Sequence, residues 1–331
     1  MLKVQNLKKY FPIKEGFIRR EIGQVFAVDD VSFEVHENET FGLVGESGCG
    51  KTTTARCITR ILDPTDGQIL FTTYGGETVD LAALPKARIR PYRKDIQMIF
   101  QDPFSSLNPR MNLFDIVGEP LLVHGVQDRK DRQERVTELL EQVGLRPEYM
   151  PRFPHAFSGG ERQRISIARA LALNPRLVVA DEPVSALDVS VQAQILNLLV
   201  DLQDQYGLTY IFVSHDLSVV RHICARVAVM YVGKLVELAP TLSLFGRPRH
   251  PYTEALLTAV PKPDPRLRSE RILLQGDVAN PAKPPAGCYF HPRCKYAMEK
   301  CREAAPVLEQ VGENHHVSCH RAHELDLKGI H

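Results

Sequence analysis

The residues at positions 45–52 read GESGCGKT and fit the phosphate-loop pattern G-x-x-x-x-G-K-[ST] without a mismatch. They follow the apolar stretch FGLVG and precede a segment that suits a helix. Glycines let the backbone N–H groups converge on phosphate oxygens, and a helix N-terminus adds partial positive charge. We therefore predict a nucleotide site in which Lys51 reaches the β- and γ-phosphates and Thr52 holds Mg²⁺. The residues assigned to ATP in this loop are Gly45, Glu46, Ser47, Gly48, Cys49, Gly50, Lys51, Thr52 and Thr53.

Two acidic side chains follow a second apolar stretch, in the sequence LVVADEP at 177–183. Ligands of open α/β sheets lie beyond the carboxyl ends of the strands, so Asp181 and Glu182 are expected beside the nucleotide. Asp181 can support Mg²⁺ through its water shell, and Glu182 can accept a proton from an attacking water. The sequence VSHD places His215 after a third apolar stretch. A single histidine there is more often structural, so its catalytic assignment depends on the complete set of motifs.

A second glycine-rich stretch, FSGGERQR at 157–164, has no apolar strand directly before it. It is therefore not a phosphate loop of the strand-to-helix kind. A serine followed by two glycines at the start of a helix offers hydrogen-bond donors and a positive dipole end. Such a start is a capped helix in any case, and it can also bind an anion.

Four of the seven cysteines lie near the end of the chain with the spacing C-x5-C-x6-C-x17-C. They are Cys288, Cys294, Cys301 and Cys319. The chain starts without a secretory signal, so stable disulfides are not expected. Zinc sites typically use tighter C-x2-C pairs, and four thiolates can instead bind a [4Fe–4S] cluster in a reducing compartment. Zinc, free thiols, or ligation by His291, His315 or His320 are the alternatives.

The elements that must position these residues alternate along the chain. We expect strands at 41–45, 177–181 and 210–214, and helices at 51–62, 127–143 and 189–206. This alternation predicts a parallel sheet with helices on both faces, hence an α/β protein. A hairpin is expected at 227–238, turning at Gly233. Proline becomes frequent after 260, which suggests a boundary near 256–262 and a small loop-rich extension beyond it.

Composition excludes some classes of function. The 331 residues are 44% hydrophobic and carry a formal net charge of +1, so no strong field favours nucleic acid. We find no uninterrupted apolar run of the ~20 residues that a membrane-spanning helix needs.

Taken together, the motifs resemble the nucleotide-binding subunit of an ABC transporter over residues 1–255. The matching pieces are GESGCGKT, Gln101 in IFQDP, FSGGERQ as the signature motif, ADEP, SALD and VSHD. The resemblance implies a P-loop NTPase with a RecA-like core, an antiparallel β subdomain and a helical subdomain at about 88–172. It implies a nucleotide-binding domain at 1–256 and a C-terminal extension with the four cysteines at 257–331.

The same resemblance implies a head-to-tail dimer in which each ATP lies between the phosphate loop of one subunit and the signature motif of the other. The residues implied to contact the partner's ATP are Ser158, Gly159, Gly160, Glu161 and Asp188. Tyr10 matches the aromatic that stacks on adenine, with Phe26 a weaker candidate, although either can be core. The implied catalytic residues are Glu182, His215, Gln101 and Lys51. The implied Mg²⁺ residues are Thr52, Gln101 and Asp181.

Two longer segments, 97–117 and 249–265, resemble the peptide-uptake branch of ABC importers, whose members carry dipeptides, oligopeptides, nickel or some oligosaccharides. Within this branch, the sequence is most similar to the "F" ATPase subunit of dipeptide and oligopeptide systems. The resemblance implies a second ATPase subunit (a paralogue), two transmembrane permease subunits, an extracytoplasmic substrate-binding protein, and a place at the cytoplasmic face of the membrane. It also implies an iron–sulfur cluster in some members. A non-transport ABC ATPase acting on nucleic acid or ribosomes is the alternative of another class.

Within 103–117, the family receives the coupling helix of its membrane subunit. Phe104, Leu107, Met111 and Leu113 are the apolar residues that would meet it, or else they belong to the core of the helical subdomain.

Overall fold

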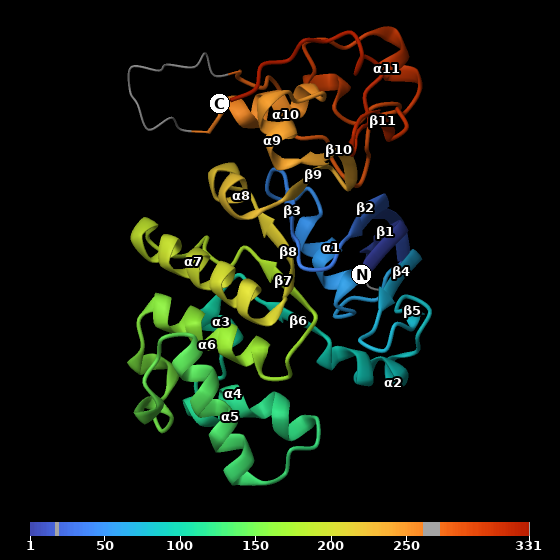
Figure 1. Ribbon diagram of the computed structural model, residues 1–331. Helices are drawn as coiled ribbons and strands as arrows, with labels where there is room; N and C mark the ends of the chain where they lie inside the picture. The colour runs from blue at the N-terminus through green and yellow to red at the C-terminus, as the bar shows by residue number, and fades with distance from the viewer. Residues whose placement is uncertain (17–19, 261–271, 331) are drawn as a thin grey trace.

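The computed structural model describes residues 1–16, 20–260 and 272–330. Its main feature is a sheet in the order β11-β12-β10-β9-β3-β8-β7-β6, in which the neighbours from β9 to β6 are parallel (Figure 1). The strands of this sheet are β3 (Thr40–Val44), β6 (Ile96–Ile99), β7 (Leu177–Asp181), β8 (Thr209–Ser214), β9 (Arg226–Tyr231), β10 (Lys234–Pro240), β11 (Glu309–Gly312) and β12 (His315–Val317). The predicted parallel sheet is confirmed, and the hairpin at 227–238 is the β9–β10 pair.

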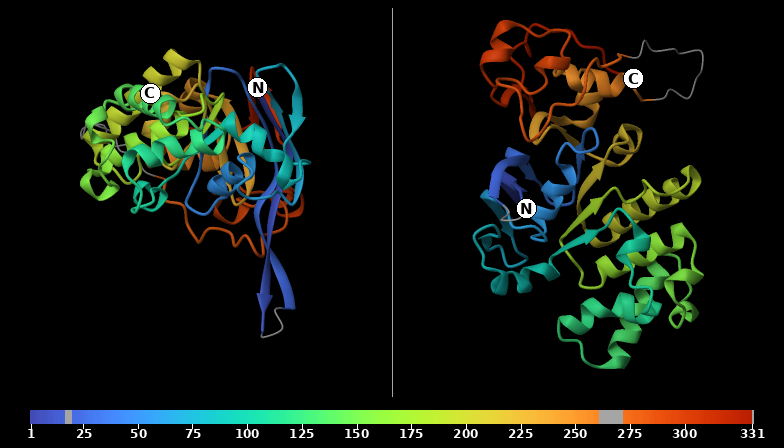
Figure 2. Two further views of the ribbon diagram at one scale, coloured as in Figure 1. Left: turned by 90° about the horizontal axis from the view of Figure 1, so that it is seen from below. Right: turned by 180° about the vertical axis from the view of Figure 1, so that it is seen from behind.

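A smaller antiparallel sheet in the order β2-β1-β4-β5 lies beside the main one. Its strands are β1 (Leu2–Glu15), β2 (Arg20–Val35), β4 (Asp66–Thr72) and β5 (Thr78–Asp80). The charged residues within KVQNLKKYF and VFAVDDVSFEV predict only short strands in this region. Instead β1 and β2 pair along almost their whole length, and the far end of this hairpin projects from the body of the molecule (Figure 2).

The described residues form eleven α-helices, which include those predicted at 51–62, 127–143 and 189–206. They are α1 (Lys51–Ile58), α2 (Lys86–Ile89), α3 (Pro103–Ser106), α4 (Leu113–Val123), α5 (Arg129–Gln142), α6 (Gly159–Leu171), α7 (Val189–Tyr206), α8 (Leu217–Ile223), α9 (Thr241–Gly246), α10 (Pro251–Thr258) and α11 (Glu299–Glu303). Helices α3 to α6 form a lobe at the lower left of Figure 1, away from the small sheet. Within the segment predicted as a helical subdomain, 88–172, residues 96–99 form strand β6 of the main sheet, and the helices of the lobe begin after it with α3.

The core explains why the parallel strands read as continuous apolar runs. Along β7, Val178 and Ala180 belong to one buried cluster, with residues of α6 and α7. Leu177 and Val179 belong to a second buried cluster, with residues of α1 and the small sheet. A strand covered on both faces needs apolar side chains at every position, as parallel sheets usually do. The predicted α/β class is therefore correct.

The C-terminal residues are attached to the main sheet. Strand β12 pairs antiparallel with β10, and β11 pairs with β12 at the edge. Glu237 of β10 is completely buried and accepts hydrogen bonds from His315 Nε2 and from the backbone of Arg249 and His250, at 2.8, 2.7 and 3.0 Å. Residues after 272 thus build on the same sheet that carries the phosphate loop. Residues 261–262 of the predicted boundary at 256–262, and the prolines at 263 and 265 that follow them, lie outside the described residues.

Among the helices that the structure describes, none has the length and apolar character required to cross a membrane.

Candidate nucleotide site

The phosphate loop follows β3 and leads into α1, as predicted. Gly45 and Gly50 have φ values of 150° and 106°, in the region that favours glycine. A Cβ atom on Gly45 would lie 2.2 Å from the carbonyl oxygen of Met230, and one on Gly50 would lie 2.2 Å from that of Ala27. Both positions therefore require glycine. Ser47 and Gly48 at the tip of the loop are exposed, so this part of the loop is open to a ligand.

Lys51 is buried, and its Nζ donates to the carbonyl oxygens of Gly45 and Glu46 at 2.8 and 3.0 Å. Its ammonium group is therefore held inside the curve of its own loop. On the next residue, Thr52 Oγ1 donates to Asp181 Oδ1 at 2.9 Å, across the gap between α1 and β7. Thr53 is half-buried on α1.

Asp181 is a buried carboxylate at the end of β7. Burial raises its pKa, although the hydrogen bond from Thr52 opposes that change. A carboxylate oxygen and a hydroxyl oxygen are hard ligands of the kind that Mg²⁺ uses, and a cation beside Asp181 would favour its charged form. The pair thus fits the Mg²⁺ expected at Thr52 and Asp181.

Glu182 has the left-handed backbone conformation, with φ of 47°. This is uncommon for a non-glycine residue and costs energy, so it occurs mostly where the surrounding structure enforces it. Here the backbone N–H of Glu182 donates to the carbonyl of Val213 on β8, at 3.0 Å. Its carboxylate meets Gln101 Nε2 at 2.9 Å and His215 Nδ1 at 3.1 Å. The structure therefore brings together the three polar side chains predicted from three separate motifs.

The signature motif forms the first turn of α6. Ser158 is the N-cap and forms a reciprocal capping box with Glu161, whose Oε2 accepts from the Ser158 backbone N–H at 2.8 Å. A Cβ on Gly160 would lie 2.5 Å from Val191 of α7, and one on Gly159 would touch Leu187. In Figure 1, α6 lies in the helical lobe, separated from α1. Among the described residues, no hydrogen bond joins this turn to the phosphate loop of the same chain.

Asp188, the other residue assigned to the neighbouring ATP, is exposed at the start of α7. Its side chain caps that helix by accepting from the backbone N–H of Val191 at 3.0 Å. Asp188 and Ser158 are therefore both helix N-caps, and α6 and α7 pack against each other.

Tyr10 lies on β1 with its ring edge against Phe26, at 4.8 Å between centroids. Its hydroxyl donates to Asp29 Oδ1 at 2.8 Å. Burial, and to a smaller extent this hydrogen bond, raises the pKa of Tyr10. Asp29 also accepts from Tyr289 and from Lys234, at 3.0 and 2.9 Å. The position of Tyr10 is thus fixed partly by a residue of the C-terminal extension, which the sequence did not reveal.

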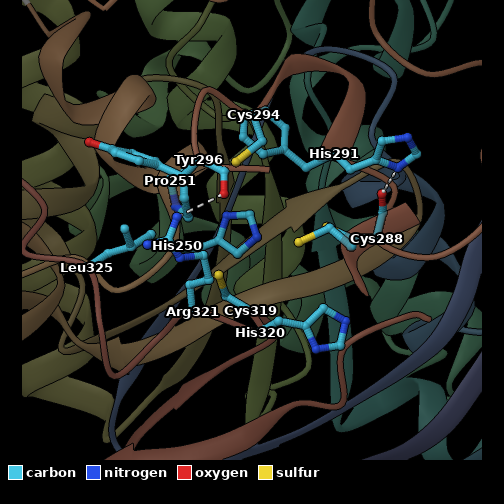
Figure 3. A pocket seen from close by; sticks show the side chains of 12 residues that line it. His250, Pro251, Cys288, His291, Cys294, Tyr296, Cys319, His320, Arg321 and Leu325 are labelled. Atoms are coloured by element: carbon cyan, nitrogen blue, oxygen red, sulfur yellow. Dashed lines mark hydrogen bonds between the residues drawn. The ribbon is translucent and has the colours of Figure 1, made fainter. Parts of the chain in front are cut away.

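The four clustered cysteines line one cavity, which His250, Phe290 and Tyr296 also line (Figure 3). Burial raises the pKa of Cys288, Cys294 and Cys319 to about 11 each, and neighbouring cysteines add to the effect. Over the described ranges of the chain, no three Cys, His, Asp or Glu side chains converge tightly enough to hold a metal ion. The structure therefore does not by itself support the predicted iron–sulfur cluster, although it gathers the four thiols.

The three histidines considered as substitute ligands have other partners. His291 Nδ1 and His320 Nε2 lie 2.9 and 2.8 Å from the backbone carbonyls of Cys288 and Ala304. His315 is bonded to Glu237. The histidine that sequence reasoning missed is His250, which lines the cavity from the start of α10.

The apolar residues considered for the coupling helix divide into two kinds. Leu107 and Leu113 are core residues, and Met111 packs against the core. Phe104 is 58% exposed, with the guanidinium of Arg162 stacked 4.1 Å from its ring centroid. Of the four, Phe104 has the most exposed side chain and is the strongest candidate for contact with another protein.

Fold and site together define an ATP-binding cassette ATPase of the ABC transporter type. The family model described as "ABC transporter" matches residues 28–185. Two solved structures of the cassette MJ0796 are similar. One is a dimeric post-hydrolysis state bound to ADP and Pi, with TM-score 0.64, 29% identity, and coverage of 73% of this chain and 99% of that one. The other is a dimeric structure of the same bacterial cassette, with TM-score 0.63, 27% identity and the same coverage.

The chain belongs to the ATP-binding proteins of the oligopeptide and dipeptide transporter family. The model described as "Oligopeptide/dipeptide transporter, C-terminal region" matches residues 236–301. The chain is 52% identical to the oligopeptide transport ATP-binding protein AppF of Bacillus subtilis, over 97% of both chains. It is 50% identical to the dipeptide transport ATP-binding protein DppF of Haemophilus influenzae, over 96% of both chains. The predicted family is therefore confirmed.

Proposed function

We propose that this chain is the ATP-hydrolysing, energy-coupling subunit of an importer for dipeptides or oligopeptides. The observation that supports this most strongly is full-length similarity to AppF and DppF, together with the match of residues 236–301 to the oligopeptide/dipeptide transporter C-terminal region. The nucleotide-binding domain is assigned to 1–256 and the extension, with its four cysteines, to 257–331.

The phosphate loop binds ATP by turning its N–H groups and the start of α1 toward the phosphates. In the structure, Nζ of Lys51 donates to two carbonyls of the loop. When ATP binds, this ammonium turns to the β- and γ-phosphates, which are stronger acceptors than carbonyl oxygens. Mg²⁺ would be held by Thr52, with Asp181 and Gln101 near it, and it would neutralise the charge of the phosphates.

Hydrolysis requires a base for the attacking water. We assign that role to Glu182, because its backbone N–H donates to β8 and its carboxylate lies between Gln101 and His215. Glu182 accepts a proton from the water while the water oxygen bonds to the γ-phosphorus. The bond between the γ-phosphorus and the oxygen that bridges it to the β-phosphate breaks, and ADP leaves. Gln101 and His215 keep the carboxylate in position, and His215 can interact with the γ-phosphate.

A closed site needs a second cassette. The start of α6 offers a helix N-terminus, formed by Ser158, Gly159, Gly160 and Glu161. Within the described part of the chain it makes no hydrogen bond to this chain's own phosphate loop, and Asp188 lies exposed beside it. We assign these residues to the ATP of the facing subunit, a paralogue or an identical chain. ATP then closes the dimer, and hydrolysis lets it open, so that two permease subunits can alternate their access. A separate binding protein outside the membrane delivers the solute, and the ATPase works at the cytoplasmic face.

For the cysteine cavity we propose a [4Fe–4S] cluster, with zinc as the alternative. The gathered thiols of Cys288, Cys294, Cys301 and Cys319 support a bound group. A cubane holds its thiolates further apart than a single ion, whose Zn–S bonds are ~2.3 Å long. Among the described residues no such tight ligand set is found, so the proposal rests on the four gathered thiols and on the resemblance to the peptide-importer branch. Burial raises the pKa of Cys288, Cys294 and Cys319, so these thiols are protonated near neutral pH and binding of the group must release their protons.

The decisive experiment removes the chain from its host and measures uptake of labelled dipeptide, oligopeptide, nickel and oligosaccharide. Restoring the wild-type chain should recover peptide uptake, and Glu182→Gln should not. Recovery of nickel or oligosaccharide uptake alone would refute the peptide assignment. Normal uptake of every solute without the chain would refute the transport role.

A further inference from the structure

The phosphate loop is tied to the C-terminal extension by an ion pair that neither motif reveals. Arg293 Nη1 lies 2.8 Å from Glu46 Oε2, and Nη2 lies 3.2 Å from Glu46 Oε1. This is the bidentate arrangement in which a guanidinium binds a carboxylate most specifically. The side chain of Arg293 is 8% exposed and that of Glu46 is 26% exposed, so the pair is sheltered from solvent more than an ordinary surface pair.

Glu46 holds the shape of the loop through its backbone. Its carbonyl accepts from Lys51 Nζ at 3.0 Å and from the backbone N–H of Cys49 at 3.3 Å. Its own backbone N–H donates to the Tyr252 hydroxyl at 2.8 Å. The Glu46 side chain points toward Arg293 and so has its own partner. Fixing this one residue therefore fixes the position of the carbonyl that holds Lys51.

Arg293 is itself held on a short, well-anchored segment, 288–294. At one end Tyr289 donates to Asp29 at 3.0 Å. In the middle, the buried ring of Phe290 packs against Tyr231 and Tyr252, at 5.2 and 5.3 Å between centroids. Tyr252 is thus bonded to the loop and packed on the segment at the same time. The guanidinium therefore approaches Glu46 from a segment that is held by contacts with Asp29, Tyr231 and Tyr252.

We propose that Arg293 is a positioning residue of the nucleotide site, which acts through Glu46 to hold the phosphate loop in the shape that receives ATP. This inference rests on the proposed nucleotide site. It gives the C-terminal extension a role in ATP binding, in addition to its own cysteine cavity. Because the guanidinium of Arg293 is bound to Glu46 and is not among the groups assigned to the phosphates, its loss should weaken nucleotide binding and leave the chemical step nearly unchanged.

The test measures the affinity of the anaerobically purified full chain for MgATP and for inorganic tripolyphosphate, together with kcat and KM. Arg293→Met should lower the affinity for both ligands by about tenfold, the effect of losing one charge-assisted hydrogen-bonded pair. Its kcat at saturating ATP should stay within about threefold of the wild-type value. Glu46→Gln should do the same. The double variant should be no weaker than either single variant, because both remove one interaction. Arg293→Lys, which keeps the charge without the fork, should lie between.

Lys295→Gln is the matched control, since Lys295 is an exposed cation two residues further on that pairs with Glu254 instead. It should leave nucleotide affinity unchanged. Unchanged affinity in Arg293→Met and Glu46→Gln, or effects of the two that multiply, would overturn the inference. Lys51→Ala distinguishes failure of the proposed nucleotide site from failure of the role assigned to Arg293. If it also leaves binding intact, the proposed nucleotide site itself is wrong; if it abolishes binding while Arg293→Met does not, the role of Arg293 alone is refuted.

Discussion

The side chains of Gln101 and Glu182, 81 residues apart in the sequence, meet at one oxygen: Nε2 of Gln101 lies 2.9 Å from Oε2 of Glu182. His215 Nδ1 reaches the same Oε2 at 3.1 Å. Neither contact involves Oε1, so one oxygen of the carboxylate is held while the other can face a water molecule. This arrangement fits a general base whose position is set by its neighbours.

Glu182→Gln should lower ATP turnover by about 10²- to 10⁴-fold, because an amide cannot accept the proton that a carboxylate takes from water. The amide keeps the size of the side chain and can still bond to Gln101, so MgATP affinity should stay within about threefold. Steady-state turnover and equilibrium binding measure the two effects. Glu141→Gln, on the exposed face of α5, is the control with the same chemical change. Fast turnover by Glu182→Gln would exclude Glu182 as the base.

Asp181→Asn should raise the Mg²⁺ concentration needed for half-maximal turnover by about 10- to 100-fold, the usual cost of disturbing the residues that orient a metal ligand. The amide oxygen can still accept from Thr52, so the loss would report the charge and not the hydrogen bond. Titration of Mg²⁺ at fixed ATP measures it. An unchanged Mg²⁺ dependence would remove Asp181 from the metal site.

Cys49 should react slowly with iodoacetamide in the folded chain, although it lies within the phosphate loop. Its side chain is 1% exposed, and burial raises the pKa of its thiol above the usual 9.0, against the pull of Lys51. The thiolate is the reactive form, so the rate should stay low near pH 8 and increase only at higher pH. Mass spectrometry after timed alkylation tests this. Once modified, the chain should not bind ATP, because an adduct cannot fit beside Gly45. Rapid labelling at neutral pH would contradict this account.

Glu237→Leu should lower the free energy of unfolding by about 3–5 kcal/mol, since it leaves three buried donors without their acceptor. These donors are His315 and the backbone N–H groups of Arg249 and His250. Denaturant unfolding measures the loss. Glu309→Gln, on the exposed edge strand β11, should change stability little. A loss of less than about 1 kcal/mol in Glu237→Leu would show that the extension does not depend on this residue.

Much of the nucleotide site could be predicted from the sequence because its parts are local. GESGCGKT predicts its own turn and helix, and the apolar stretch before Asp181 predicts the strand that carries it. The α7 helix, Val189–Tyr206, agrees with the predicted range because Asp188 caps its start and Gly207 ends it in the left-handed conformation.

The contacts between distant segments could not be predicted in the same way. Nothing in the spacing of Glu46 and Arg293, or of Glu237 and His315, shows that they meet, because each pair depends on how β10 and the extension fold back. The length of the β1–β2 hairpin was likewise hidden, since its outer half alternates weakly and is largely exposed. The cavity of the cysteines includes His250, which no cysteine spacing could indicate.

We propose that one chain carries two complementary halves of an ATPase site, and mixing two inactive variants tests whether the halves work across subunits. Lys51→Ala removes the phosphate-loop half, and Ser158→Arg blocks the signature half. Each should be inactive alone, under conditions where the wild-type chain alone turns over ATP. An equimolar mixture should recover about a quarter of wild-type activity, because half of the randomly formed dimers hold one intact site. A mixture as inactive as its components would contradict a site shared between two subunits.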